Sequence, residues 1–171
     1  MLEIFALLSL IGSLIVLYIL SVIDLRDRLL PNELVMGFMC LGLIFHLSTL
    51  MHYTGFADMA LGALIGGGIL FLIRGVANAF YKEDTLGLGD VKLLGAAGIW
   101  LGPEAILIAM TLGAFLGFLH GMMVALRTVS HSKVGMDLTK LAIPAGPGFA
   151  LGIVITGAMH FHDIFQVLWP T

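Results

Sequence analysis

Residues 87–101 read Gly-Leu-Gly-Asp-Val-Lys-Leu-Leu-Gly-Ala-Ala-Gly-Ile-Trp-Leu, which places the acid Asp90 just ahead of a hydrophobic run. A second acid, Asp24, stands at the end of another hydrophobic run, seven residues before Pro31. A charge at a membrane boundary is costly, so an acid kept there is a functional candidate. Two such acids on the same side of a bilayer would favour paired-carboxylate chemistry.

The composition indicates a membrane protein. Of the 171 residues, 60% are hydrophobic and only 11% are charged, and the mean hydropathy is +1.09. A soluble domain of this length could not bury so much apolar surface, whereas a bilayer can cover it. We therefore expect a single transmembrane domain over residues 1–171. Cys40 is the only cysteine, which excludes an internal disulfide and a tetracysteine metal site.

Six hydrophobic segments are candidates for membrane-spanning helices, because about 20 apolar residues suffice to cross the hydrocarbon core. Their approximate bounds are 4–23, 33–51, 58–80, 90–101, 104–127 and 144–168. Between the fourth and fifth segments, Gly102-Pro103 is typical of a tight turn, with glycine ending one helix and proline beginning the next. The expected fold is an all-α polytopic membrane protein of about six transmembrane helices.

The basic residues fall in or beside alternate connections between these segments. They are Arg26, Arg28, Arg74, Lys82, Lys92, Arg127, Lys133 and Lys140. The positive-inside rule then places the first, third and fifth connections in the cytoplasm and both termini on the non-cytoplasmic side. The same orientation brings Asp24 and Asp90 to one boundary, the cytoplasmic one.

Glycines recur at four-residue spacing along the later segments. The sets are Gly62 with Gly66, Gly98 with Gly102, Gly113 with Gly117 and Gly121, and Gly148 with Gly152. Small residues at this spacing let membrane helices approach closely. We interpret them as packing positions.

Each acid also has a structural interpretation. Asp24 opens a stretch whose arginines could simply anchor a solvated loop in the headgroup region, with Pro31 starting the next helix. Asp90 follows two glycines, so it could serve as the N-cap of a helix after a flexible turn. Two carboxylates held within a few ångströms would instead share a proton and titrate as a unit. One member could then take a proton from water while the other polarises a peptide carbonyl, without metal, cofactor or nucleophilic side chain.

These pieces together resemble the type IV prepilin peptidases, which are intramembrane aspartic proteases of the GxGD type. The matching parts are Asp24 with Pro31-Asn32, Gly87-Leu-Gly-Asp90 running into Val-Lys92-Leu-Leu, and Ile143-Pro144-Ala-Gly146-Pro147. The resemblance extends over residues 15–155 or so. The chain is similar to the short members, which lack the N-terminal cysteine-rich cytoplasmic domain.

The resemblance implies a function and a place in the cell. It implies a membrane-embedded endopeptidase of the bacterial inner membrane that removes basic leader peptides from prepilins or pseudopilins at the cytoplasmic face. Asp24 and Asp90 would be the catalytic pair. Longer members of the family also N-methylate the new terminus, but this sequence has no obvious methyl-donor site, so the resemblance favours the peptidase activity alone. The implied partners are the prepilin substrate and membrane lipid, with no nucleic acid and no cofactor.

Further positions in or beside these motifs could bind the substrate or shape the site. They are Gly87, Gly89, Lys92, Asp27, Pro31, Asn32, Pro144, Gly146 and Pro147. Asp27 could attract a basic leader, although such contacts are screened by salt. Lys92 could orient a neighbouring group or extend to the lipid headgroups. His160 and His162 have a spacing that can bind a metal, but they end a helix far from the acids, so we expect no metal site.

Two other functions fit parts of the pattern. A small transporter could use Asp24 and Asp90 to bind a cation or relay protons. No polar residues follow a path from these acids to the other side, which argues against transport. A catalytically silent assembly protein could bind pilin helices through its glycine-rich faces, but the retained acid pair argues against that.

Overall fold

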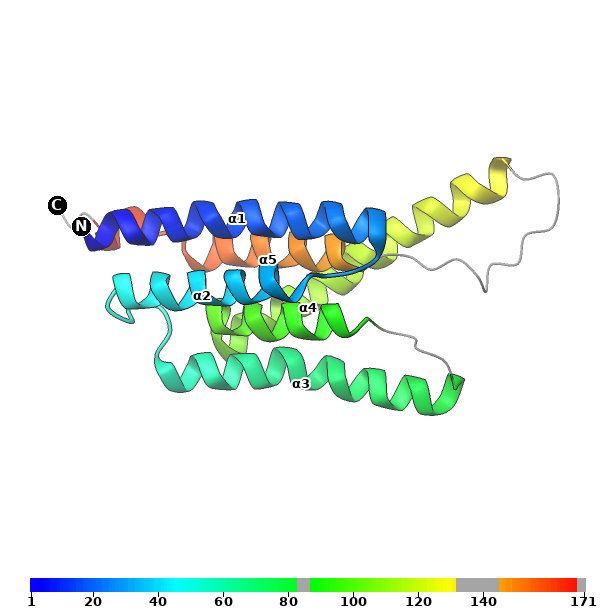
Figure 1. Cartoon of the computed structure of the whole chain (residues 1–171), viewed down its shortest axis with the longest axis horizontal. Helices are drawn as coiled ribbons and strands as arrows, with labels where there is room; N and C mark the ends of the chain where they lie inside the picture. Colours follow the sequence, from blue (N-terminus) through cyan, green and yellow to red (C-terminus); the bar gives the residue numbers. More distant parts are fainter. Residues whose placement is uncertain (83–86, 132–144, 169–171) are drawn as a thin grey trace.

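The computed structural model describes residues 1–82, 87–131 and 145–168. Within these ranges all regular elements are helices. Their order is α1 (Leu2–Asp27), α2 (Asn32–Ser48), α3 (Phe56–Tyr81), α4 (Leu88–His131), α5 (Gly146–His160) and α6 (Ile164–Leu168) (Figure 1). This confirms the expected all-α class.

The helices have the length and surface of membrane spans. Three segments are long and apolar enough to cross a bilayer, namely Leu2–Asp27, Phe56–Tyr81 and Leu88–Leu126, while α2 and α5 are shorter apolar helices. Large hydrophobic side chains such as Leu8, Leu64 and Leu72 are more than half exposed on the outside of the bundle. Such a surface is unfavourable in water and suits lipid. The chain is therefore a polytopic α-helical membrane protein.

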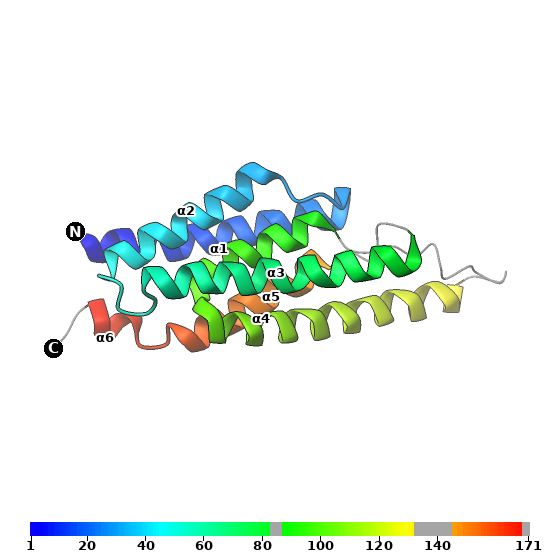
Figure 2. The ribbon, with the colours of Figure 1, turned by 90° about the horizontal axis from the view of Figure 1, so that it is seen from below.

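Helix α4 is two arms joined by a sharp reversal. Gly102 has φ 71° and ψ −176°, and Pro103 follows it. This backbone region is almost closed to residues with a side chain, so glycine is needed there. Figure 2 shows the second arm running back along the bundle from this turn. The turn predicted at Gly102-Pro103 is confirmed.

The last predicted span is interrupted. We expected one segment over 144–168, but α5 ends at His160 and the short α6 begins at Ile164. Phe161 closes α5 and packs edge-on against Phe45 of α2, with ring centroids 4.8 Å apart. The break coincides with a polar interruption of the hydrophobic run at His160, His162 and Asp163.

Close glycine contacts hold the centre of the bundle together. A Cβ atom added at Gly62 would collide with the backbone of Gly98, and one at Gly148 would lie 2.6 Å from the amide nitrogen of Gly117. The first contact joins α3 to the first arm of α4, and the second joins α5 to the second arm. The interpretation as packing positions is confirmed for Gly62, Gly98 and Gly148, whereas a Cβ atom at Gly117 would itself meet nothing within 4 Å.

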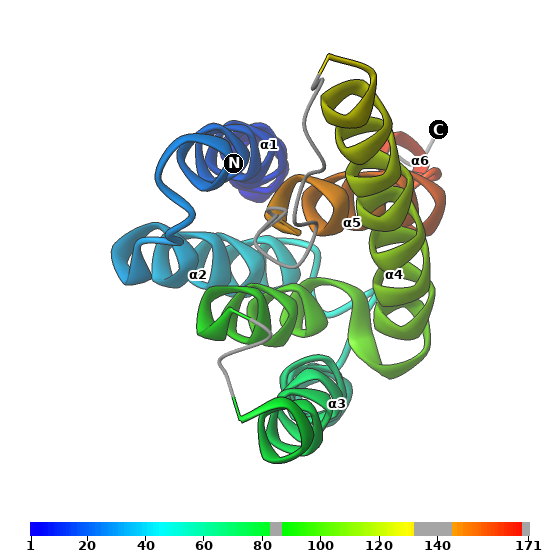
Figure 3. The same ribbon diagram turned by 90° about the vertical axis from the view of Figure 1, so that its right-hand side faces the viewer.

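The bundle has two distinct ends. The N-terminus, α6 and the reversal at Gly102 lie at one end, while the end of α1 and the starts of α4 and α5 lie at the other (Figures 1 and 2). The main packing partners of α1 are α2 and α5, whereas α4 packs on α2, α3 and α5. Figure 3, viewed from the end where α4 and α5 start, shows α5 between α1 and the second arm of α4.

Candidate active site

Asp24 and Asp90 are buried at the same end of the bundle. Asp24 lies in the last turn of α1 and is 6% exposed, and Asp90 lies in the first turn of α4 and is 7% exposed. The two carboxyls are close enough for the charge of Asp24 to act on Asp90. Two acids that are nine-tenths buried in an apolar bundle are unusual, because an ionised carboxylate is costly to bury. Their juxtaposition makes this the candidate active site.

The carboxylate of Asp24 is held by the start of α5. The backbone N–H of Gly146 donates a hydrogen bond of 3.0 Å to its Oδ2. The first N–H groups of a helix have no partner within the helix and carry partial positive charge, so they suit an acid side chain. A Cβ atom at Gly146 would lie 2.5 Å from the same oxygen. Only glycine therefore allows this approach.

Asp90 has a different environment. Its Oδ1 has no hydrogen-bond partner among the described residues. A Cβ atom at Gly87 would lie 3.2 Å from its Oδ2, so the backbone before α4 passes directly beside this oxygen. The N-cap interpretation of Asp90 is wrong, because α4 begins two residues earlier, at Leu88. Asp90 therefore projects from inside the first helical turn, with one oxygen available for a new partner.

The connection between α1 and α2 packs over the start of α4. A Cβ atom at Gly89 would lie 2.7 Å from Cβ of Leu30, so the leucine side chain rests on the glycine backbone. Lys92 donates a hydrogen bond of 2.8 Å from Nζ to Oδ1 of Asn32, the first residue of α2. Sequence reasoning missed Leu30. Its signal was an apolar residue between Arg28 and Pro31, in a connection otherwise rich in charge.

The remaining predicted positions are spread around this region. Pro31 immediately precedes α2 as its N-cap, and Pro147 lies in the first turn of α5. Asp27 does not lie in the buried site with Asp24 and Asp90. Its half-exposed side chain lies 3.8 Å from Nε of Arg26 at the surface. Pro144 lies outside the described residues.

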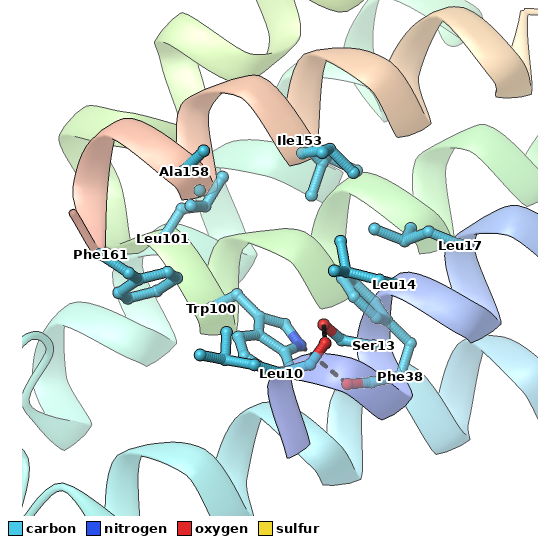
Figure 4. A pocket seen from close by; sticks show the side chains of 12 residues that line it. Leu10, Ser13, Leu14, Leu17, Phe38, Trp100, Leu101, Ile153, Ala158 and Phe161 are labelled. Carbon is cyan, nitrogen blue, oxygen red and sulfur yellow. Dashed lines mark hydrogen bonds between the residues drawn. The ribbon is translucent and has the colours of Figure 1, made fainter. Parts of the chain in front are cut away.

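An apolar cavity of about 260 Å³ lies elsewhere in the bundle. Figure 4 shows its wall, which includes Leu17, Phe38, Trp100 and Phe161. The polar side chains in this view are Ser13 and Trp100, and both are already hydrogen-bonded: the Ser13 hydroxyl donates to the carbonyl of Leu10, and the Trp100 indole N–H donates to the carbonyl of Phe38. The described residues that line the cavity include no ionisable side chain, so the cavity offers no acid–base chemistry.

The acid pair is suited to one kind of chemistry. Among the described residues, no group of three or more His, Cys, Asp or Glu side chains is placed to hold a metal ion. The site offers one carboxylate fixed by a backbone donor and a second carboxyl with an unpaired oxygen. Such a pair can activate a water molecule and polarise a carbonyl group.

Comparison with known proteins agrees with this description. The model of the type IV leader peptidase family matches residues 11–122, which include both acids. No solved structure matches the chain.

Curated relatives cover most of this chain but only part of their own length. A prepilin leader peptidase/N-methyltransferase of Aeromonas salmonicida is 34% identical over 80% of this chain and 44% of the relative. Proteins of the same name from Pectobacterium carotovorum and Escherichia coli K12 are 36% and 35% identical, over 82% and 80% of this chain and 48% and 56% of theirs. The chain thus spans about half the length of the curated relatives it matches. By the family match, which takes in well over half of its residues, the chain belongs to the type IV leader peptidase family.

Proposed function

We propose that this protein is a membrane-embedded aspartic endopeptidase that removes the short basic leader from type IV prepilins or pseudopilins. The single observation that carries the proposal is the burial of Asp24 and Asp90 at the same end of the bundle, near enough for their charges to interact. Family membership and the names of the relatives supply the substrate class. The proposal is limited to cleavage of the leader.

The proposed reaction uses the two acids as one unit. The ionised carboxylate takes a proton from water, and the resulting hydroxide attacks the carbonyl carbon of the scissile peptide bond. The protonated carboxyl donates to the carbonyl oxygen as charge develops there. The C–N bond then breaks and the leaving nitrogen takes up a proton from the pair. The base role belongs to the pair, because coupled acids titrate together.

The surrounding residues hold the pair for this reaction. The N–H of Gly146 fixes the orientation of the Asp24 carboxylate. The unpaired Oδ1 of Asp90 is free to meet the substrate or the attacking water. Fixing reacting groups before the reaction lowers the entropic part of the barrier.

We also infer that this end of the bundle faces the cytoplasm. Arg26, Arg28, Lys82 and Lys92 lie at the same end as the acids. Lysine and arginine are enriched in cytoplasmic connections of membrane proteins. The proposed location is therefore the bacterial inner membrane, with the site at its cytoplasmic face.

Cleavage in a purified system tests the proposal. The protein is reconstituted in lipid with a prepilin that carries a basic leader, and the mature product is identified by mass. We expect cleavage at the leader junction, and we expect Asp24→Asn and Asp90→Asn each to lower the rate by at least two orders of magnitude, the size of general acid–base effects.

Asp58→Asn is the control, because Asp58 is an exposed acid in the first turn of α3, at the opposite end of the bundle from Asp24. It should retain near-normal activity. Either active-site variant maturing a prepilin at a near-normal rate would contradict the paired-acid mechanism. Failure of the wild-type protein to cleave any of a panel of prepilins and pseudopilins would contradict the proposed activity itself.

A further inference from the structure

The two helices that carry the acids, α1 and α4, pack mainly on third helices and not on each other. Asp24 belongs to α1, which packs mainly on α2 and α5, and Asp90 belongs to α4, which packs mainly on α2, α3 and α5. The separation of the carboxyls therefore depends on intermediate elements. One of these is α5, through Gly146. The other is the connection between α1 and α2.

That connection begins at Arg28, one helical turn after Asp24. The backbone N–H of Arg28 donates to the carbonyl oxygen of Asp24 over 3.0 Å, and Arg28 has a left-handed conformation with φ 55°. The chain then turns toward α4, where Leu30 rests on the backbone of Gly89. Residue 89 immediately precedes Asp90. The segment that follows Asp24 therefore carries Leu30, and Leu30 packs on the turn that carries Asp90.

A second contact lies on the other side of Asp90. Lys92 reaches from the same turn of α4 to Asn32 and donates a 2.8 Å hydrogen bond between residues 60 apart in sequence. Asn32 is the first residue of α2, and the N-cap position before it is held by Pro31, so the Asn32 side chain does not stand at the capping position of its own helix. Its side-chain oxygen is therefore used for the contact with Lys92 rather than for starting α2.

We propose that Lys92 is a positioning residue that acts through Asn32 to hold the Asp90 turn at the right distance from Asp24. The inference rests on the proposed function and adds a role to a residue that does not touch the reacting atoms. Contacts at residues 89 and 92 fix the short turn between them from both sides. The contact of Leu30 with Gly89 is steric, so it keeps the first turn of α4 from moving closer to the connection between α1 and α2. The hydrogen bond from Lys92 to Asn32 keeps the same turn from moving away from the start of α2.

This role differs from that of a lysine that only anchors the helix in lipid. An anchoring lysine acts through its charge at the headgroups, so its loss would affect insertion and would be independent of Asn32. A positioning lysine acts through one acceptor. Its loss should leave the fold intact, because both side chains are at the surface, while the geometry of the acid pair loosens.

Kinetics of five variants test this difference. We expect Lys92→Met to lower kcat for leader cleavage by roughly 10- to 100-fold, since small misplacements of reacting groups have costs of that order, with KM little changed. Asn32→Ala should have a similar effect, and the double variant should be no worse than the worse single variant. Lys92→Arg keeps a donor and should restore most of the rate. Lys82→Met removes another basic residue at the same end of the bundle and should change nothing.

A distance measurement tests the proposal without activity. Spin labels are placed at Arg26→Cys and Leu88→Cys in a Cys40→Ala background, since both positions are exposed and flank the two acids. We expect a narrow distance distribution that broadens with Lys92→Met and with Asn32→Ala but not with Lys82→Met. An unchanged distribution in the Lys92→Met protein, or additive kinetic losses in the double variant, would overturn the positioning role. An inactive wild-type protein would count against the proposed function while leaving the distance result to stand on its own.

Discussion

Gly146 and Asp24 lie 122 residues apart in the sequence and are joined by a hydrogen bond of 3.0 Å from a backbone N–H to a carboxylate oxygen. The bond makes the first turn of α5 a part of the environment of an acid carried by α1. A buried carboxylate without a donor would be strongly unfavourable, so the glycine N–H accounts for how this acid is tolerated in the bundle. The proposed chemistry therefore depends on a residue that has no reactive group.

We predict that Gly146→Ala impairs cleavage strongly while leaving the protein in the membrane. The new methyl group would lie 2.5 Å from Oδ2 and 2.9 Å from Cγ of Asp24, so either the acid or the start of α5 must move. We expect a loss on the order of 100-fold in kcat, the size reported for misplaced catalytic groups. The assay is leader cleavage by purified protein at matched concentration.

Gly75→Ala in α3 is the control for this substitution, because nothing lies within 4 Å of a Cβ atom built at Gly75. Its activity and thermal stability should match those of the wild type. Normal kinetics for Gly146→Ala would show that α5 can move without disturbing Asp24.

A second prediction concerns the packing of α3 on α4. A Cβ atom at Gly98 would collide with the backbone of Gly62, which cannot rotate away as a side chain could. We expect Gly98→Ala to destabilise the fold by about 1–3 kcal/mol, the usual cost of overpacking. Thermal unfolding in detergent measures the effect. Gly68→Ala, which introduces the same methyl group on α3 into open space, should leave the midpoint nearly unchanged.

The proposed orientation predicts which residues a reagent can reach from each side of the membrane. Single cysteines are introduced at Arg26 and Phe56 in a Cys40→Ser background, because both positions are exposed and lie at opposite ends of the bundle. In intact cells a membrane-impermeant maleimide should label position 56 and spare position 26. After the cells are opened, both should react. The reverse pattern would place the acid pair on the outer face.

A contact at the end of the bundle opposite Asp24 and Asp90 predicts that the stability of the fold depends on pH. Tyr53 donates a 3.0 Å hydrogen bond to Oδ1 of Asp163. That bond is the main cause that lowers the pKa of Asp163, and the pKa of Tyr53 is raised by burial and by the same partner. A carboxyl with a lowered pKa stabilises the fold above its ordinary value of 3.8 and loses that contribution as the pH falls through its folded value.

Thermal unfolding of wild type and Tyr53→Phe between pH 6 and pH 3 checks this sign. We expect the wild-type Tm to be higher at pH 6 and the two values to converge at acid pH. Asp163→Asn should resemble Tyr53→Phe and show the same weak pH dependence. A difference between wild type and Tyr53→Phe that persists at the acid end would assign the contact to packing rather than to charge.

The sequence could predict features that depend on the length and spacing of apolar runs. The helical class and the reversal at Gly102-Pro103 follow from such patterns, and so does the placement of Asp24 and Asp90 at helix ends. The continuous span predicted over 144–168 is wrong near its end, although His160, His162 and Asp163 mark a polar interruption in the sequence. In the structure Phe161 packs there against Phe45 of α2. The contacts of Leu30 with Gly89 and of Lys92 with Asn32 could not be predicted. They depend on how each helix is rotated about its axis, which hydropathy does not report.

The bond between Gly146 and Asp24 has a consequence for the order in which the protein is made. Because synthesis runs from the N-terminus, the ribosome adds Asp24 and Asp90 before it adds α5. At that stage the nascent chain has its two carboxyls but lacks the N–H that fixes one of them. The site is completed only when α5 arrives, so an unfinished chain cannot hold the pair in its final geometry.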